Sequence, residues 1–241
     1  MEPELWVTKL FNDRLAALGN SILGFVGVPP DPRPWANFVV MQFLVVLLLM
    51  VVAALLRFRL SADRPGNFQQ TFELIYEFVH GQAEDQIGQD GVQYMGYFGT
   101  IFLFILTANL IGIVPCFESP TQNPSVTAGC ALATFVYYNL MGIQAHGFKY
   151  PLHFAGPVWW LAPLMLPIEI ISHLARCLSL TVRLYANMFA GDQVTTVFLR
   201  LTFFLVPVVF MGLHIFVGLI QAYIFMLLTM VYVGGAVAHE H

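Results

Sequence analysis

A row of polar side chains repeats at helical spacing inside an apolar region between residues 169 and 192. An arginine at the centre of a bilayer costs about 2.5–3.5 kcal/mol on insertion scales, so it stays there only with a partner or a function. A helix with such a row must therefore face something other than lipid, although snorkelling to an interface or clamping of a neighbouring helix is the purely structural alternative. At steps of 3, 4, 3, 4 and 4 residues, the row consists of Glu169, Ser172, Arg176, Ser179, Arg183 and Asn187.

The side chains in and beyond this row divide into a fixed charge and groups that exchange protons. A guanidinium does not deprotonate in proteins, so Arg183 can attract a carboxylate or repel a proton but cannot carry one. Asp192 follows Arg183 by nine residues, about 180° around a helix, and so is expected to face away from the row. His214 and Gln221 share one face of the next apolar segment, with Gly218 between them. A buried histidine is by itself more often a structural hydrogen-bonding group.

Membrane helices must position these groups. Of the 241 residues, 58% are hydrophobic and only 10% are charged, whereas a soluble domain has about 25% charged residues. Several uncharged runs exceed the roughly 20 residues that span a bilayer, and none alternates like a β-barrel strand. We predict an all-α polytopic membrane protein with five membrane passes and an amphipathic surface helix, whose last two helices form a long, steeply tilted hairpin. No basic segment precedes the first apolar run, so no cleaved signal peptide is expected.

The predicted segments form a single membrane domain over residues 1–241. An extracytoplasmic segment with a short surface helix is expected first, and arginines at 57, 59 and 64 after the first span indicate that this span ends in the cytoplasm. The N-terminus is therefore expected outside and the C-terminus in the cytoplasm. In order, the segments are 1–34, the first transmembrane helix 35–57, a cytoplasmic amphipathic helix 68–89, a transmembrane hairpin 92–146, and the tilted hairpin 157–238.

The tilt is inferred from length alone. Residues 201–238 contain 38 residues without a charge, which would form one helix of about 57 Å against a hydrocarbon core of about 30 Å. A break at Pro207, or two short spans joined by a re-entrant turn, would account for the same length.

Several runs resemble subunit a of the bacterial F-type ATP synthase. They are LTVRLYANMFAGD (180–192), PIEII (167–171), LHIFVGLIQAYIFMLLTMVY (213–232) and the loop-containing TANLIGIVPCFESPTQNPSVT (107–127). The resemblance extends from about Phe68 to the end. It implies a non-catalytic, proton-translocating stator in the bacterial inner (plasma) membrane, with two half-channels that load and unload carboxylates on a ring of c subunits. Proton flow is thereby coupled to rotation and ATP synthesis. The implied partners are the c-ring, the b subunit of the peripheral stalk, other ATP synthase subunits and lipid, with no cofactor or metal.

The resemblance also assigns roles to single residues. It implies that Arg183 is the essential stator charge and that Asp192 and His214 are an interacting inlet pair, although an Asp replaces the more common Glu at position 192. Where family members often have Asp, Asn and Thr in the loop, this chain has Asn123, Ser125 and Thr127. An inlet carboxylate is therefore missing or is supplied by Glu118. The remaining proton-pathway residues implied are Gln221, Asn187 and Glu169, with Arg176 and Ser179 as secondary members.

Other classes fit the sequence less well. A haem protein would draw its ligands from His146, His153, His173 and His214, but no pair has the small-residue clearance that a porphyrin needs, and Arg183 would have no role. An intramembrane hydrolase based on Ser172, Ser179 and His173 lacks a GxSxG-like elbow. A net charge of −4 without a basic cluster does not favour nucleic acid. The widely spaced Cys116, Cys130 and Cys177 indicate neither a disulfide framework nor a metal site. A stand-alone ion channel or transporter remains the alternative, although no internal repeat supports it.

Overall fold

Five long apolar helices dominate the structure, a computed structural model that describes residues 4–27, 29–61, 66–114, 117–147, 162–201 and 205–237. Within those ranges all regular structure is helical. The five helices long and apolar enough to cross a membrane are α2 (Asn37–Arg59), α4 (Met95–Ile111) with the preceding 3-10 turn η1 (Gln89–Tyr94), α5 (Pro124–His146), α7 (Ala162–Leu201) and α8 (Leu205–Val237). The chain is a multi-pass helical membrane protein, as the sequence predicts.

Two further helices lie before α2 and between α2 and α4. The first, α1 (Trp6–Val26), has 21 residues and is longer than the short surface helix expected there. The second, α3 (Asn67–Ile87), corresponds to the predicted amphipathic helix. Predictions that fall on Arg64, Lys149, His153 and the start of the last hairpin at 157–161 lie outside the described residues.

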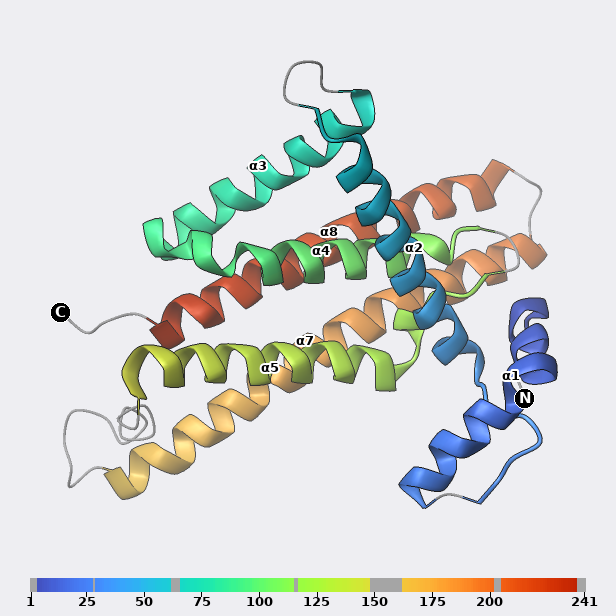
Figure 1. Cartoon of the computed structure of the whole chain (residues 1–241), viewed down its shortest axis with the longest axis horizontal. Helices are drawn as coiled ribbons and strands as arrows, with labels where there is room; N and C mark the ends of the chain where they lie inside the picture. The colour runs from blue at the N-terminus through green and yellow to red at the C-terminus, as the bar shows by residue number, and fades with distance from the viewer. Residues whose placement is uncertain are drawn as a thin grey trace.

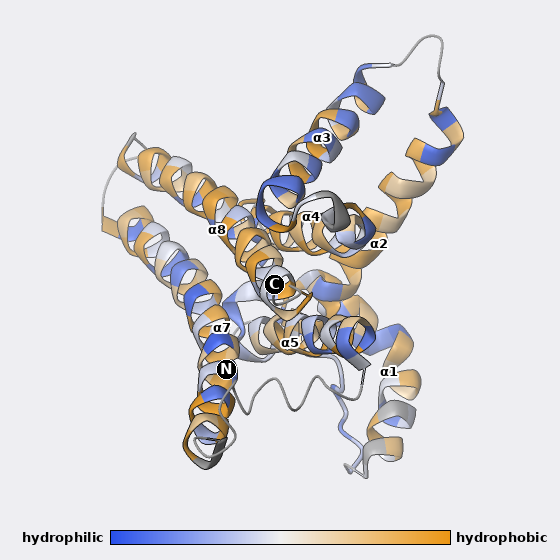
Figure 2. Cartoon of the chain, turned by 90° about the vertical axis from the view of Figure 1, so that its left-hand side faces the viewer, coloured by the Kyte–Doolittle hydropathy of each residue, from blue (hydrophilic) through white to orange (hydrophobic). Residues whose placement is uncertain are grey.

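Hydrophilic residues concentrate on α3, as Figure 2 shows by colour. Val79 and Ala83 are buried against the rest of the protein, and the hydroxyl of Tyr223 on α8 donates to Oε1 of Gln82 at 2.9 Å. The carboxylates of this helix, by contrast, are exposed. Tyr76, which shares the helical spacing of Phe72, Ile75 and Val79 in the sequence, is also exposed. The helix therefore packs through a narrower apolar face than the sequence suggests.

Helices α7 and α8 form the long hairpin. With 40 and 33 residues they measure about 60 and 50 Å, well above the roughly 30 Å of a hydrocarbon core, so they must be strongly tilted to fit. Pro207 lies in the first turn of α8, where its missing N–H removes no internal helical bond. It therefore starts the helix and does not break it. In Figure 1 both helices run past α4 and α5, and α7 packs on α5 and α8 while α8 also packs on α4.

The core lies where α3, α4, α5, α7 and α8 meet. Fully buried side chains from three of these helices interlock there, including Phe98 and Ile105 of α4, Leu184 of α7, and Phe225 of α8. A smaller cluster joins Met41 and Val45 of α2 to α4. The outer face of α7 remains exposed, since only 6% of its apolar window is buried within the chain. The hairpin thus shares one face with the core and leaves the other for lipid or a partner.

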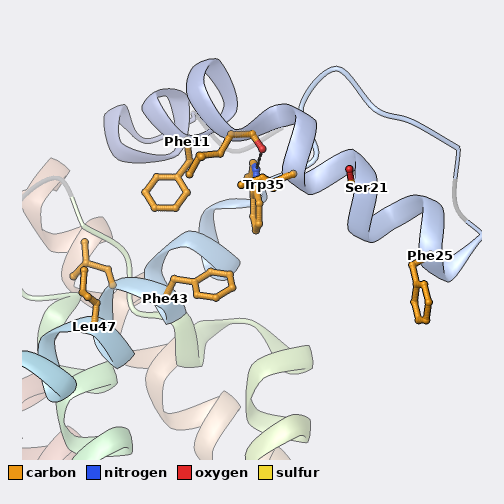
Figure 3. Close-up of a pocket in the computed structure, with 9 residues that line it drawn as sticks. Phe11, Ser21, Phe25, Trp35, Phe43 and Leu47 are labelled. Carbon is orange, nitrogen blue, oxygen red and sulfur yellow. Dashed lines mark hydrogen bonds between the residues drawn. The ribbon is translucent and has the colours of Figure 1, made fainter.

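Helix α1 is attached to the beginning of α2 by an aromatic contact. The indole Nε1 of Trp35 donates to the carbonyl oxygen of Leu15 at 2.9 Å, and the Trp35 ring meets Phe11 and Phe43 edge to face. Between the two helices lies an apolar groove of about 670 Å³, whose labelled side chains in Figure 3 include Phe25 and Leu47. This contact holds the N-terminal segment beside the same end of the bundle as the loop after α4.

Candidate functional site

The predicted polar row lies on one continuous helix, α7, at the border of its packed face. Leu180, Leu184 and Met188 are buried against the core, and the row runs beside them. Within the row, Glu169, Ser172, Arg176 and Arg183 are half-buried, whereas Ser179 and Asn187 are exposed. The row is therefore neither hidden in the core nor centred on the outer face.

Arg183 makes no ion pair or hydrogen bond with any residue that the structure describes. It lies in the middle of a span of 38 residues, and the carboxylates nearest to it along the helix are Glu169 and Asp192, 14 and 9 residues away. These separations correspond to about 21 and 14 Å along the axis. The side chain thus has a fixed positive charge and no described counter-ion in its own chain.

One turn beyond Arg183, the row is joined to α8. The Nδ2 group of Asn187 donates to Oε1 of Gln221 at 2.8 Å. Gln221 is only 1% exposed, and its Nε2 group has no hydrogen-bond partner. A buried amide with a free donor is costly in an apolar setting, so this pair is suited to receive a water molecule or a polar group beside Arg183. The structure therefore brings Gln221 of α8 to Asn187, one helical turn from Arg183.

Asp192 lies in a separate polar cavity of about 550 Å³ at one end of the bundle. The cavity is formed by α7, the loop after α4 and the N-terminal segment, and Glu118 and Asn123 line it too. Glu118 therefore supplies a carboxylate from the loop, which the sequence left open, and Glu4 adds another from the N-terminal segment. The other charged and polar side chains lining this cavity are Thr8, Asn12, Arg33, Asn37, Ser119, Gln122 and Gln193.

His214 of α8 lies against Gly191 of α7 and does not line the Asp192 cavity. It is 8% exposed, its Nε2 atom has no partner, and it lines a smaller cavity of about 240 Å³ together with Asn187. A Cβ atom at Gly191 would lie 2.8 Å from Nδ1 of His214, so only glycine permits this approach of α8 to α7. No hydrogen bond or ion pair joins Asp192 to His214 in the described structure. Their interaction stays a prediction.

The three loop residues have different environments. Asn123 caps α5, since its Oδ1 accepts from the backbone N–H of Ser125 at 2.9 Å. Ser125 is exposed, whereas Thr127 is fully buried and donates to the carbonyl oxygen of Pro124 at 3.1 Å. Only Asn123 therefore both shapes the helix start and lines the Asp192 cavity.

A second polar cluster surrounds the other end of the row. Nε2 of His173 lies 3.3 Å from Oε1 of Glu169, and the Tyr138 hydroxyl of α5 lies 2.6 Å from Nδ1 of the same ring. The guanidinium of Arg176 lies over the ring of Tyr232 on α8, 5.5 Å from its centroid. Arg176 thus clamps α7 to α8 by a cation–π contact, which agrees with the structural alternative for this residue.

A buried hydrogen-bond network behind the site was not identified from the sequence. Asn109 of α4 donates from Nδ2 to the carbonyl oxygen of Gly218 at 3.1 Å and accepts at Oδ1 from the hydroxyl of Thr121 at 2.8 Å. Thr121 belongs to the 3-10 turn η2 (Pro120–Gln122), and its hydroxyl is also 2.6 Å from that of Ser119. The network fixes the α8 face that bears His214 and Gln221. In the sequence, the feature that could have indicated this network was the single asparagine, Asn109, within an uncharged span.

Among the described residues, no group of three or more His, Cys, Asp or Glu side chains is close enough to hold a metal ion. Cys130 and Cys177 are free thiols. His173 and His214 occupy opposite ends of the site, one bonded to Tyr138 and the other lying against Gly191.

Comparisons with known proteins were made on the whole chain. Residues 39–234 match the family described as ATP synthase A chain. The chain is 65% identical over 233 residues to the ATP synthase subunit a of Solibacter usitatus (strain Ellin6076), which covers 96% of this chain and 100% of that protein. It is 49% identical over 244 residues to the ATP synthase subunit a of Koribacter versatilis (strain Ellin345), with full coverage of both. The protein of that name from Geobacter sulfurreducens (strain ATCC 51573 / DSM 12127 / PCA) is 40% identical over 206 residues, covering 86% of this chain and 90% of its own.

Proposed function

Because the chain belongs to the ATP synthase A chain family, we propose that it is the non-catalytic, proton-conducting stator subunit of an F-type ATP synthase. In this proposal, two half-channels open to opposite sides of the membrane, and Arg183 lies between them. A carboxylate on each c subunit of a rotating ring receives a proton from one half-channel and releases it to the other. Proton flow is thereby coupled to rotation and to ATP synthesis in the catalytic part of the complex.

The observation that carries the proposal is the unpaired charge of Arg183. A guanidinium in a membrane span requires compensation, and the described chain offers it no carboxylate. A carboxylate on a neighbouring subunit would supply the missing partner, and it would be drawn to Arg183 whenever it is deprotonated. The same fixed charge repels a free proton and so separates the two half-channels.

The positions of the two polar clusters support two separate half-channels. Asp192 and Glu118 line a polar cavity at one end of the bundle, and Glu169 with His173 lies toward the other end of α7. Glu169 and Asp192 are 23 residues apart, about 34 Å along the helix axis, so the two clusters lie far from each other even on a tilted helix. We assign the Asp192 cavity to the extracytoplasmic inlet, with His214 and the Asn187–Gln221 pair leading from it towards Arg183. Glu169 belongs to the cytoplasmic exit.

The proposal includes the surroundings of the subunit. The exposed outer face of α7 supports docking of the c-ring beside the row, and the b subunit of the peripheral stalk is a further proposed partner. Arginines at 57 and 59 end α2, which supports a cytoplasmic location of that end, and hence an extracytoplasmic N-terminus and a cytoplasmic C-terminus in a bacterial inner membrane. The stand-alone channel is the alternative, and co-purification with a multimeric c-ring separates the two.

The experiment compares passive proton uptake by vesicles that contain the membrane sector without its catalytic head. Arg183→Ala is expected to make these vesicles leak and to abolish proton-driven ATP synthesis in the complete complex. Arg183→Lys keeps a charge but replaces the planar fork by a group that can deprotonate when buried, so it too should abolish synthesis. Because 100 mV is worth about 2.3 kcal/mol per charge, even a slow leak dissipates the driving force.

Arg200→Ala is the matched control, since Arg200 lies exposed in the last turn of the same helix. It should leave vesicles tight and synthesis intact. A tight Arg183→Ala sector that still drives ATP synthesis would remove Arg183 from the mechanism and refute the proposal.

A further inference from the structure

The cluster around His173 brings together side chains from three helices and includes a histidine for which the proposed function has no role so far. The Tyr138 hydroxyl of α5 is 2.6 Å from Nδ1 of His173, and Nε2 of the same ring is 3.3 Å from Oε1 of Glu169. The Tyr138 and His173 rings are stacked with their centroids 5.5 Å apart. Tyr138 is 2% exposed, so this geometry is fixed by the core.

The chemistry of the three groups sets the direction of their hydrogen bonds. A neutral imidazole has one N–H donor and one acceptor nitrogen. A carboxylate of Glu169 can only accept, so Nε2 has the hydrogen, and Nδ1 is left to accept from the hydroxyl of Tyr138. Tyr138 thereby selects the tautomer of His173, in the way that a second hydrogen bond commonly does for a functional histidine.

The titratable and charged groups around His173 come from all three helices. On α7 they are Glu169, Arg176 and Cys177, one turn before or after the ring. Tyr138 faces it from α5, and Tyr232 of α8 contacts Tyr138 at a centroid distance of 6.0 Å. Arg176 is held over the Tyr232 ring. The fixed charge of Arg176 is thus held by an aromatic ring on α8, while Glu169 faces His173.

We propose that His173 is a proton-carrying residue of the half-channel that contains Glu169, with its tautomer set by Tyr138. This inference rests on the proposed function. A proton that reaches Nδ1 turns the Tyr138 hydroxyl from donor to acceptor and produces an imidazolium. The Nε2–H bond then breaks as an O–H bond forms on Glu169, so that imidazolium and carboxylate are both neutralised. The reverse sequence carries a proton from Glu169 outward, and no electron transfer or further reactant is involved.

The test uses inverted vesicles that contain the complete complex and measures ATP-driven proton pumping per assembled complex. His173→Gln retains an N–H donor and a carbonyl acceptor but cannot take up a proton. It should slow pumping by about 100-fold, the lower end of what a positioned proton-transfer group contributes. Its rate should also lose the dependence on pH between about 5 and 8 that an imidazole gives. Tyr138→Phe removes only the hydroxyl and should slow pumping less than His173→Gln.

Tyr137→Phe is the matched control for Tyr138→Phe. Tyr137 is the adjacent residue on α5, its ring stacks on Tyr97 at 3.8 Å, and its hydroxyl has no hydrogen-bond partner in the described structure. It should pump at the wild-type rate. Equal rates for the two Phe variants would overturn the role of Tyr138. Wild-type pumping and an unchanged pH profile in His173→Gln would overturn the role of His173.

Arg183→Ala, measured in the same vesicles, separates this inference from the proposed function. Wild-type behaviour of the His173 and Tyr138 variants beside an inactive Arg183→Ala complex refutes the His173 inference alone. An Arg183→Ala complex that remains tight and active refutes the proposed function, and the inference with it.

Discussion

Asn109→Leu removes the side chain that fixes α8 against α4 and the loop while preserving its approximate volume. Asn109 is fully buried, and it exchanges hydrogen bonds with the backbone of Gly218 and the hydroxyl of Thr121. Hydrogen bonds between membrane helices contribute about 0.6 kcal/mol on average, and bonds in soluble proteins about 1. Losing two of them should destabilise the subunit by about 1–2 kcal/mol, a 5- to 30-fold change in its folding equilibrium.

The stability assay is the temperature at which the subunit unfolds in the purified membrane sector. For a chain of this length, about 2–4 °C per kcal/mol is expected, so the midpoint should fall by roughly 2–8 °C. Proton flux should also fall, because His214 and Gln221 share the α8 face that Asn109 holds, whereas passive leakage should not rise. Thr121→Val should also lower the midpoint, since it deletes one of the two Asn109 bonds together with the contact to the Ser119 hydroxyl.

Thr100→Val provides the control, because the hydroxyl of Thr100 donates to Gly96 of its own helix and joins no second element. It should shift the midpoint by less than Thr121→Val does. An Asn109→Leu sector with an unchanged midpoint and normal flux would show that the network neither stabilises the subunit nor positions α8, and the reasoning would be refuted.

Three further predictions concern the inlet and the topology. Asp192→Asn should slow proton-driven ATP synthesis markedly and Asp192→Glu should largely preserve it, as measured in vesicles with an imposed gradient; normal flux in the Asn variant would take Asp192 off the pathway. Gly191→Ala places a methyl group 2.8 Å from His214, which should cost about 1–3 kcal/mol by overpacking. His214→Ala should relieve that cost in a thermal-melting double-mutant cycle, and additive losses would contradict the close contact. In a cysteine-free background, a cysteine at Asp31 should react with an impermeant reagent from the extracytoplasmic side and one at Ser61 from the cytoplasmic side. The reverse pattern would invert the assigned orientation.

The helices could be predicted because apolar length and charge spacing are local properties. The apolar run before Arg57 predicted α2, and the uncharged stretch from Leu201 predicted α8 with its ends placed within a few residues of those in the structure. The N-terminal helix α1 was underestimated because its charged residues interrupt the apolar pattern, whereas in the structure Trp35 anchors it to α2. The effect of Pro207 depended on whether it fell in the first turn or the interior of a helix, which length alone does not decide.

The candidate site could be predicted only where placing a side chain in the membrane has an unusually high free-energy cost. Arg183 and Asp192 are conspicuous in an apolar span, so their types and spacing identified them. Asn109 and Tyr138 are ordinary residues for a membrane helix, and their importance arises from partners 109 and 35 residues away in the sequence. Helical periodicity does not indicate which faces of two distant helices meet. The close approach of His214 to Gly191 is likewise a property of the packed hairpin and not of either helix.

The exposed outer face of α7 affects the stability of the subunit after its insertion into the membrane and before its assembly with a partner. Because so little of this helix is buried within the chain, a newly inserted copy presents Arg183 to lipid at a cost of about 2.5–3.5 kcal/mol until a partner arrives. In the proposed complex, that cost is absent once a carboxylate of the partner faces the guanidinium of Arg183. In the proposed complex, copies made in excess of the c-ring should therefore be short-lived in the membrane. A ring that is already complete when this chain is inserted would shorten the exposure of Arg183. The free-energy cost of exposing Arg183 to lipid therefore favours copies that are assembled with a partner over copies that are not.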